Sequence, residues 1–113
     1  MIVRNASNGS VIASAVERAT NPLSRGIGLL MRSALGAHEG LWIDRCSAVH
    51  TMGMRATLDL FFLDKDGHVL KIANSVRPFR PFVACRDAVT VVELGAGGDT
   101  GRDVLVGDRL TIE

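Results

Sequence analysis

The strongest constraint on the fold is an apolar run that ends in a turn sequence. Residues 58–63 read Leu-Asp-Leu-Phe-Phe-Leu, and residues 64–67 read Asp-Lys-Asp-Gly. Asp and Gly favour tight turns, and a second apolar run follows at once over residues 68–73. Apolar and aromatic runs bounded by turn residues are typical of strands, so the sequence predicts an antiparallel hairpin here.

Shorter apolar runs on both sides of this hairpin predict further strands. Near the N-terminus, Asn8-Gly9 separates two runs and favours a tight two-residue turn with positive φ, which gives strands near residues 1–6 and 10–18. Other strands are expected over residues 41–43 and 88–94, and residues 104–112 are expected to form a turn and a last strand. Roughly six to eight short strands are therefore predicted.

One segment has the periodicity of a helix. Thr20-Asn21-Pro22 is a good helix start, because a capping side chain precedes a proline whose missing N–H costs nothing in the first turn. Apolar residues then recur at spacings of three and four: Leu23, Ile27, Leu30 and Met31. This pattern predicts one short helix that ends near Ser33.

Length and composition fit one globular domain. The chain has 113 residues, of which 47% are hydrophobic and 22% charged. Such a chain can bury a core of its own, and its composition is not that of a disordered segment. We expect residues 1–113 to form one compact, mainly β domain, with a β-sandwich or barrel-like fold and one short helix.

Charge and hydropathy argue against several classes of partner. The formal net charge is +1, whereas a dedicated nucleic-acid binder is usually more basic. No apolar run approaches the length of a membrane span, and the N-terminus lacks the basic and apolar regions of a secretory signal. We expect a cytoplasmic protein with no nucleic-acid partner and no membrane span.

The acidic residue in the 58–63 run is the first candidate for a functional role. Strand alternation places Asp59 on one face with Phe61 and Leu63, and both faces of the strand are apolar. A buried carboxylate is costly unless hydrogen bonds or a cation meet it. Arg55, four residues earlier, is the cation we expect beside Asp59.

Two more polar positions lie at the ends of predicted strands. His50 precedes a stretch rich in small and flexible residues, which predicts a loop or bulge that leads into the 58–63 strand. Glu93 ends an apolar strand before the glycine-rich residues 95–98, where a carboxylate either caps turn amides or contacts a ligand.

A binding site is the function that these residues favour. No pairing of a nucleophile with a base and no full metal-ligand set can be identified, so we predict no catalytic residue, no metal ligand and no cofactor. The expected pocket or groove is lined by His50, Met54, Arg55, Asp59 and Glu93. Its ligand would be a small polar molecule, a saccharide or another protein.

Two alternatives stay open. The first is a hydrolase or metal-assisted enzyme that uses His50 with Asp59 or Cys46, because an imidazole can activate a thiol or a water. Cys46, His50 and Cys85 supply three potential zinc ligands, but no fourth is evident. The second alternative is a polar network that only stabilises the fold. The two cysteines are expected to be reduced and buried, although spacing alone leaves a disulfide open.

The segment 77–82 interleaves two arginines, two prolines and two phenylalanines. If exposed, these side chains could stack on a sugar, a base or a protein partner. We favour the alternative in which Phe79 and Phe82 cover the core while the arginines remain solvated.

Several sequence blocks together resemble a known family. They are Gly-Leu-Leu-Met at 28–31, Cys-Ser-Ala-Val-His-Thr-Met-Gly-Met at 46–54, Leu-Asp-Leu-Phe-Phe-Leu-Asp at 58–64, Val-Glu-Leu at 92–94 and Val-Gly-Asp at 106–108. In this order and spacing, from about Ala15 to Leu110, the chain resembles domain-of-unknown-function family 192 of bacteria and archaea. The resemblance implies a small, mainly β, sandwich-like fold with a short helix, and no established activity.

Overall fold

Ten β-strands make up about half of the described part of the chain. The computed structural model describes residues 1–19, 35–49, 56–80, 82–96 and 102–113. Within these ranges there is no helix, and the helix expected from Thr20 to about Ser33 lies outside them.

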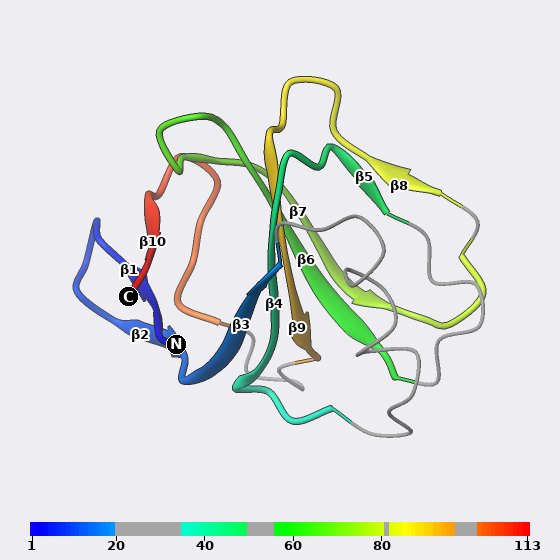
Figure 1. Cartoon of the computed structure of the whole chain (residues 1–113), viewed down its shortest axis with the longest axis horizontal. Coiled ribbons are helices and arrows are strands. Elements are labelled where there is room, and N and C mark those ends of the chain that lie inside the picture. The colour runs from blue at the N-terminus through cyan, green and yellow to red at the C-terminus, as the bar shows by residue number, and fades with distance from the viewer. Residues whose placement is uncertain (20–34, 50–55, 81, 97–101) are drawn as a thin grey trace.

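A five-stranded sheet forms the centre of the fold (Figure 1). Its strands, in spatial order, are β3 (Ala15–Ala19), β4 (Glu39–Asp44), β9 (Thr90–Gly95), β6 (Leu58–Leu63) and β7 (Val69–Val76). The predicted hairpin is confirmed as β6 and β7, which pair antiparallel. Its turn closes because Gly67, with a φ of 87°, donates its N–H to the carbonyl oxygen of Asp64.

Strands β3 and β4 pair in parallel, unlike the other neighbours in this sheet. Two parallel strands cannot be joined by a tight turn, so a crossover connection is required. Residues 20–38 make this connection, and the predicted helix falls within it.

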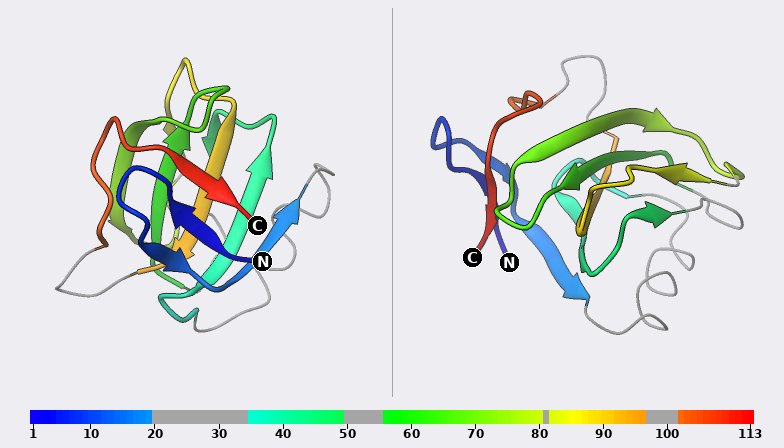
Figure 2. Two further views of the ribbon diagram at one scale, coloured as in Figure 1. Left: turned by 90° about the vertical axis from the view of Figure 1, so that its left-hand side faces the viewer. Right: turned by 90° about the horizontal axis from the view of Figure 1, so that it is seen from above.

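A three-stranded sheet brings both ends of the chain together. It has the order β10 (Leu110–Ile112), β1 (Val3–Asn5) and β2 (Val11–Ala13). The N–H of Ile2 donates to the carbonyl oxygen of Glu113 at 2.9 Å, and the N–H of Glu113 donates back at 2.8 Å. Figure 2 shows the two ends side by side.

The N-terminal hairpin is confirmed, but two details differ from the prediction. The turn has four residues rather than two, because Asn5 pairs with Ser10 and Gly9 donates its N–H back to Asn5. The single strand expected over residues 10–18 is divided at Ser14 into β2 and β3, which belong to different sheets.

The central sheet is apolar on both faces. The face that carries Trp42, here called the Trp42 face, packs against the three-stranded sheet. The opposite face, here called the Leu60 face, packs against the pair β5 (Ala48–Val49) and β8 (Val83–Ala84). All six residues of β6 are buried, as expected of a strand covered on both sides.

The mainly β, compact fold predicted from the sequence is confirmed. Of the two architectures considered, the barrel-like one is not what the described strands form, because their three sheets stay separate and do not close. In the described ranges no helix is long and apolar enough to cross a membrane.

Candidate functional site

Asp59 lies on the Trp42 face, where a β-bulge shapes its surroundings. The register between β6 and β7 shifts beside Asp59, so that β7 carries one extra residue there. In the bulge, Ser75 has a φ of 52°, and its backbone N–H donates to Asp59 Oδ1 at 2.8 Å. The Asp59 carboxylate thus accepts a hydrogen bond from a bulge N–H group, in place of a hydrogen bond between the strands.

The cation beside Asp59 is Arg102, which the sequence analysis did not identify. Arg102 Nη1 donates to Asp59 Oδ2, and Nη2 donates to the carbonyl oxygens of Ala37 and Gly95. The side chains of Arg102 and Asp59 are only 7% and 5% exposed. Burial lowers the pKa of Arg102, and the neighbouring carboxylate opposes this effect.

A buried carboxylate was expected to accept hydrogen bonds and to lie beside a cation, and Asp59 does both. Each of its two oxygens accepts a hydrogen bond. Arg55, the cation expected from the sequence, lies outside the described residues, as do His50 and Met54.

Glu93 lies on the opposite side of the central sheet. In the register of β9, Glu93 is opposite Leu41 of β4 and Leu60 of β6, and both leucines belong to the apolar cluster of the Leu60 face. Only 7% of Glu93 is exposed. Among the described residues no side chain or backbone group forms a hydrogen bond or ion pair with its carboxyl group.

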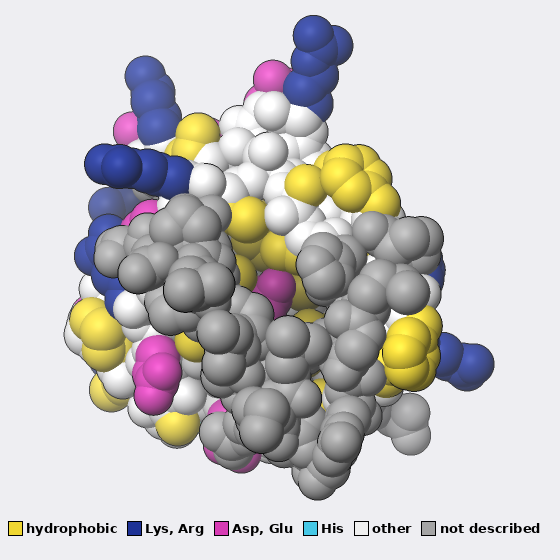
Figure 3. All heavy atoms as spheres, turned by 45° about the vertical axis from the view of Figure 1, so that its right-hand side comes forward, with side chains coloured by type: hydrophobic (Ala, Val, Ile, Leu, Met, Phe, Trp, Pro, Cys, Tyr) yellow, Lys and Arg dark blue, Asp and Glu magenta, His cyan; other side chains and the backbone are white. Residues whose placement is uncertain are grey.

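Burial raises the pKa of Glu93 to about 7, because the ionised form loses its hydration. Figure 3 views the molecule with the side that carries β5 and β8 turned forward, and acidic side-chain atoms are visible there next to hydrophobic ones. The Leu60 face thus combines apolar side chains with a buried carboxyl whose pKa is raised.

The structure does not bring Asp59 and Glu93 together. Asp59 is opposite Leu94 in the register, whereas Glu93 is opposite Leu60, so their side chains leave the sheet on different faces. Both acids were expected to line one pocket. A site built on the Leu60 face can therefore include Glu93 but not Asp59, which lies on the other side of the sheet.

The two cysteines border the Leu60 face without forming a disulfide. Cys46 and Cys85 are free, partly buried and packed against the apolar cluster of that face. The Cys46 thiol donates to the carbonyl oxygen of Ala48, with 3.2 Å between Sγ and O. The thiols are free, as expected, but they are only partly buried rather than buried.

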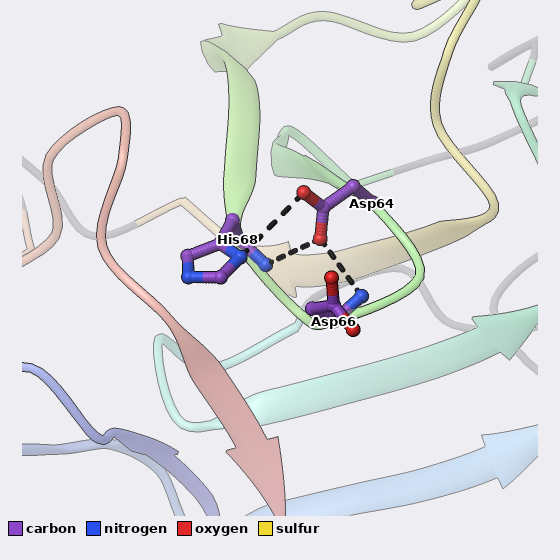
Figure 4. A group of neighbouring side chains, drawn as sticks. All are labelled: Asp64, Asp66 and His68. Carbon is purple, nitrogen blue, oxygen red and sulfur yellow. Dashed lines mark hydrogen bonds and ion pairs between the residues drawn. The ribbon is translucent and has the colours of Figure 1, made fainter.

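A group of potential metal ligands lies in the β6–β7 turn (Figure 4). Asp64, Asp66 and His68 each offer one ligand atom, and these atoms lie within 4.8 Å of one another. Asp64 Oδ1, however, accepts backbone N–H groups from Asp66 and His68, both at 2.9 Å. The pKa of Asp64 is lowered, mainly by the hydrogen bond from the backbone N–H of His68. These contacts are those of a stabilised turn.

The aromatic side chains of segment 77–82 are exposed, so the expectation that they cover the core is wrong. Phe79 is 65% exposed and Phe82 is 67% exposed. The segment passes from β7 in the central sheet to β8 in the two-stranded sheet, and the residues that enter the core are Val76 and Val83 at its two ends. Phe79 has a φ of 65°, which is unfavourable for a residue with a bulky side chain.

Comparison with known proteins supplies the family. The sequence profile of DUF192, described as "Uncharacterized ACR", matches residues 3–112. The chain belongs to domain-of-unknown-function family 192. No curated protein matches its sequence.

Two crystal structures resemble this family 192 chain over almost its whole length. One is a protein of Sinorhizobium meliloti 1021 described as a candidate transcription regulator, with a TM-score of 0.78 and 27% identity, over 97% of this chain and 89% of the other. The second is a protein of unknown function from Novosphingobium aromaticivorans DSM 12444, with a TM-score of 0.78 and 22% identity, over 98% of this chain and 82% of the other. Both support the fold.

Membership in family 192 agrees with the resemblance seen in the sequence, and it brings no established activity. The sequence blocks of the resemblance include both buried acids of the central sheet, Asp59 and Glu93. The function must therefore be argued from the geometry around them.

Proposed function

We propose that this family 192 protein is a non-enzymatic binding domain that holds a small organic molecule against the carboxyl group of Glu93. One observation carries the proposal. Glu93 is more than nine-tenths buried on the central sheet, and no described residue forms a hydrogen bond with its carboxyl group.

A buried carboxyl without a hydrogen-bond partner has a free-energy cost. Burial of an ionisable group without a partner is unfavourable, by about 1–3 kcal/mol even when the group is neutral. A leucine at this position would remove that cost, and the residues opposite it in the register, Leu41 and Leu60, are themselves leucines. A ligand that donates a hydrogen bond or carries a positive charge would supply the interaction that the described residues do not.

The neighbours of Glu93 indicate what the rest of the ligand is like. The residues that share its face are aliphatic or aromatic: Leu41, Ile43, Leu58, Leu60, Phe62 and Val91. These walls suit an apolar body and would leave most hydroxyl groups of a saccharide unpaired. We therefore expect an apolar molecule with one ammonium or hydroxyl group, rather than a saccharide.

The chemistry of the other candidates supports binding over catalysis. Both Asp59 oxygens accept hydrogen bonds within the fold, and the Cys46 thiol donates to a backbone carbonyl. Neither group is poised as a base or a nucleophile. A hydrolase that uses His50 stays an alternative predicted from the sequence. The cytoplasmic location also stays a prediction from the sequence.

The test is isothermal titration calorimetry of the full chain with n-hexylammonium and n-hexanol at a slightly alkaline pH, where Glu93 is mostly ionised. We expect n-hexylammonium to bind more tightly than n-hexanol, and Glu93→Gln to weaken ammonium binding at least about tenfold, as loss of a charged hydrogen bond predicts. Glu17→Gln, at an exposed acidic position of β3, is the matched control and should change nothing. Equal binding of n-hexylammonium by the wild type and Glu93→Gln would refute the proposal.

A further inference from the structure

The loop between β7 and β8 carries a second feature that the Glu93 site does not explain. The chain has four phenylalanines, and two of them, Phe61 and Phe62, lie in the core. The other two are in this loop and are about two-thirds exposed. Exposed aromatic side chains are unfavourable in water, and aromatic residues are enriched where proteins meet partners.

The backbone of the loop adds an independent observation. Phe79 has a positive φ of 65°, a conformation that favours glycine. The structure thus combines an unfavourable backbone with an exposed aromatic side chain at one position. Strained residues of this kind cluster at functional sites, where the strain fixes the direction of a side chain.

Charge is concentrated around the same loop. Residues 71–86 contain four basic residues, Lys71, Arg77, Arg80 and Arg86, and no acidic residue. The rest of the chain contains nine basic and twelve acidic residues, so the positive charge is local. Arg77 and Arg80 already interact within the chain, and they act here through the field they create.

We propose that the loop 77–82 is a docking surface for an acidic segment of another protein. Phe79 and Phe82 would serve as aromatic anchors, and the basic residues of the stretch 71–86 would attract the negative charges of the segment. A nucleic acid is a poorer fit, because the basic residues occupy one short stretch of a chain that is acidic elsewhere.

The experiment is selection of a random 12-residue peptide display library on the immobilised full chain. We expect the enriched peptides to contain more Asp and Glu than the unselected library, and synthetic copies to bind with an affinity that falls as salt increases. The double variant Phe79→Ser with Phe82→Ser should weaken their binding at least about tenfold. Thermal denaturation checks that this variant folds, and Phe82→Ser alone provides a second variant without a change at the strained position.

The matched control is Leu105→Ser with Val106→Ser, which removes two apolar side chains that are 72% and 63% exposed in another turn. Peptide binding should not change in this variant. Three results would overturn the proposal: no enrichment of acidic peptides, binding unchanged by loss of both phenylalanines, or tighter binding of oligo(dT) or of vesicles containing phosphatidylglycerol than of the selected peptides. None of these measurements depends on Glu93, so their failure would leave the proposed ligand site untouched.

Discussion

At the scale of single residues, the central sheet holds two buried acids in different ways. Asp59 is paired with Arg102 and with the N–H of Ser75, whereas Glu93 has no described partner and lies between leucines. The first arrangement joins parts of the fold. The second leaves a buried acid without a hydrogen bond or ion pair from the described residues.

Glu93 should make stability depend on pH. Its pKa is about 7 in the folded protein and 4.5 as the reference for the unfolded chain, so between these values the folded state binds the proton more tightly. Stability from this residue is fully present below the unfolded pKa and is lost as the pH rises to about 7, by about 3 kcal/mol in total.

Glu93→Gln removes this dependence because the amide does not titrate. Urea unfolding between about pH 4.5 and about pH 8 should show that the variant gains about 3 kcal/mol relative to the wild type as the pH rises. A difference between the two proteins that stays constant across this range would show that the carboxyl is not buried as described.

Arg102 and Asp59 form a buried ion pair, and removal of one partner should be costly. Arg102→Gln would leave a buried carboxylate without its cation, so we expect a loss of about 3 kcal/mol in the free energy of unfolding. Arg18→Gln, which breaks an exposed pair with Asp44, should cost less than about 1 kcal/mol. Chemical denaturation measures both, and similar losses in the two variants would contradict the structural role of Arg102.

The sequence could identify the acids but not their surroundings. Asp59 and Glu93 are visible as acids inside apolar runs, because strand alternation is local. Arg102 is separated from Asp59 by 43 residues, and it follows glycine-rich residues that give no periodic signal. The placement of the two acids on opposite faces follows from the register of β6 with β9, which only the folded sheet defines.

At the scale of secondary structure, local signals predicted the hairpins and missed the long-range pairings. The β6–β7 turn and the Gly9 turn depend on residues next to one another. Two features depend on which sheet each strand joins: the parallel pairing of β3 with β4, and the division of the strand at Ser14. The residues next to each strand in the sequence do not determine which sheet it joins.

The pairing of β4 with β9 requires a glycine beside Glu93. A Cβ atom at Gly40 would lie 1.8 Å from the carbonyl oxygen of Glu93, which is backbone and cannot move aside cheaply. We expect Gly40→Ala to cost at least about 3 kcal/mol in unfolding free energy.

Gly9→Ala is the comparison for this prediction. Gly9 has a φ of 82° with no atom within 4 Å of an added Cβ, so its replacement should cost only the strain of a positive φ, about 1–2 kcal/mol. Urea unfolding ranks the two variants, and a smaller loss in Gly40→Ala than in Gly9→Ala would contradict the close approach of β4 to β9.

At the scale of the whole molecule, the two larger sheets should unfold together. The Trp42 face packs against the three-stranded sheet, and their shared core includes Val3, Leu110 and Phe61. Because that sheet also unites both ends of the chain, loss of its packing should affect the entire fold.

Leu110→Ala tests this coupling. Leu110 is 2% exposed, so its truncation should cost about 3 kcal/mol. The fluorescence of Trp42, the single tryptophan, and the far-ultraviolet circular dichroism should still change in one shared transition. Two separate transitions would show that the three-stranded sheet unfolds on its own.

The central claim is that Glu93 is a buried carboxyl available to a ligand, and its own titration tests this most directly. The measurement is a ¹³C NMR titration of the Glu93 side-chain carboxyl, with Glu93→Gln used to assign the signal, in the absence and presence of n-hexylammonium. We predict a midpoint at about pH 7 in the free protein, and a lower midpoint with n-hexylammonium, because a bound cation favours the ionised form. A midpoint near the reference value of 4.5 in the free protein, or one that n-hexylammonium does not move, would contradict the claim.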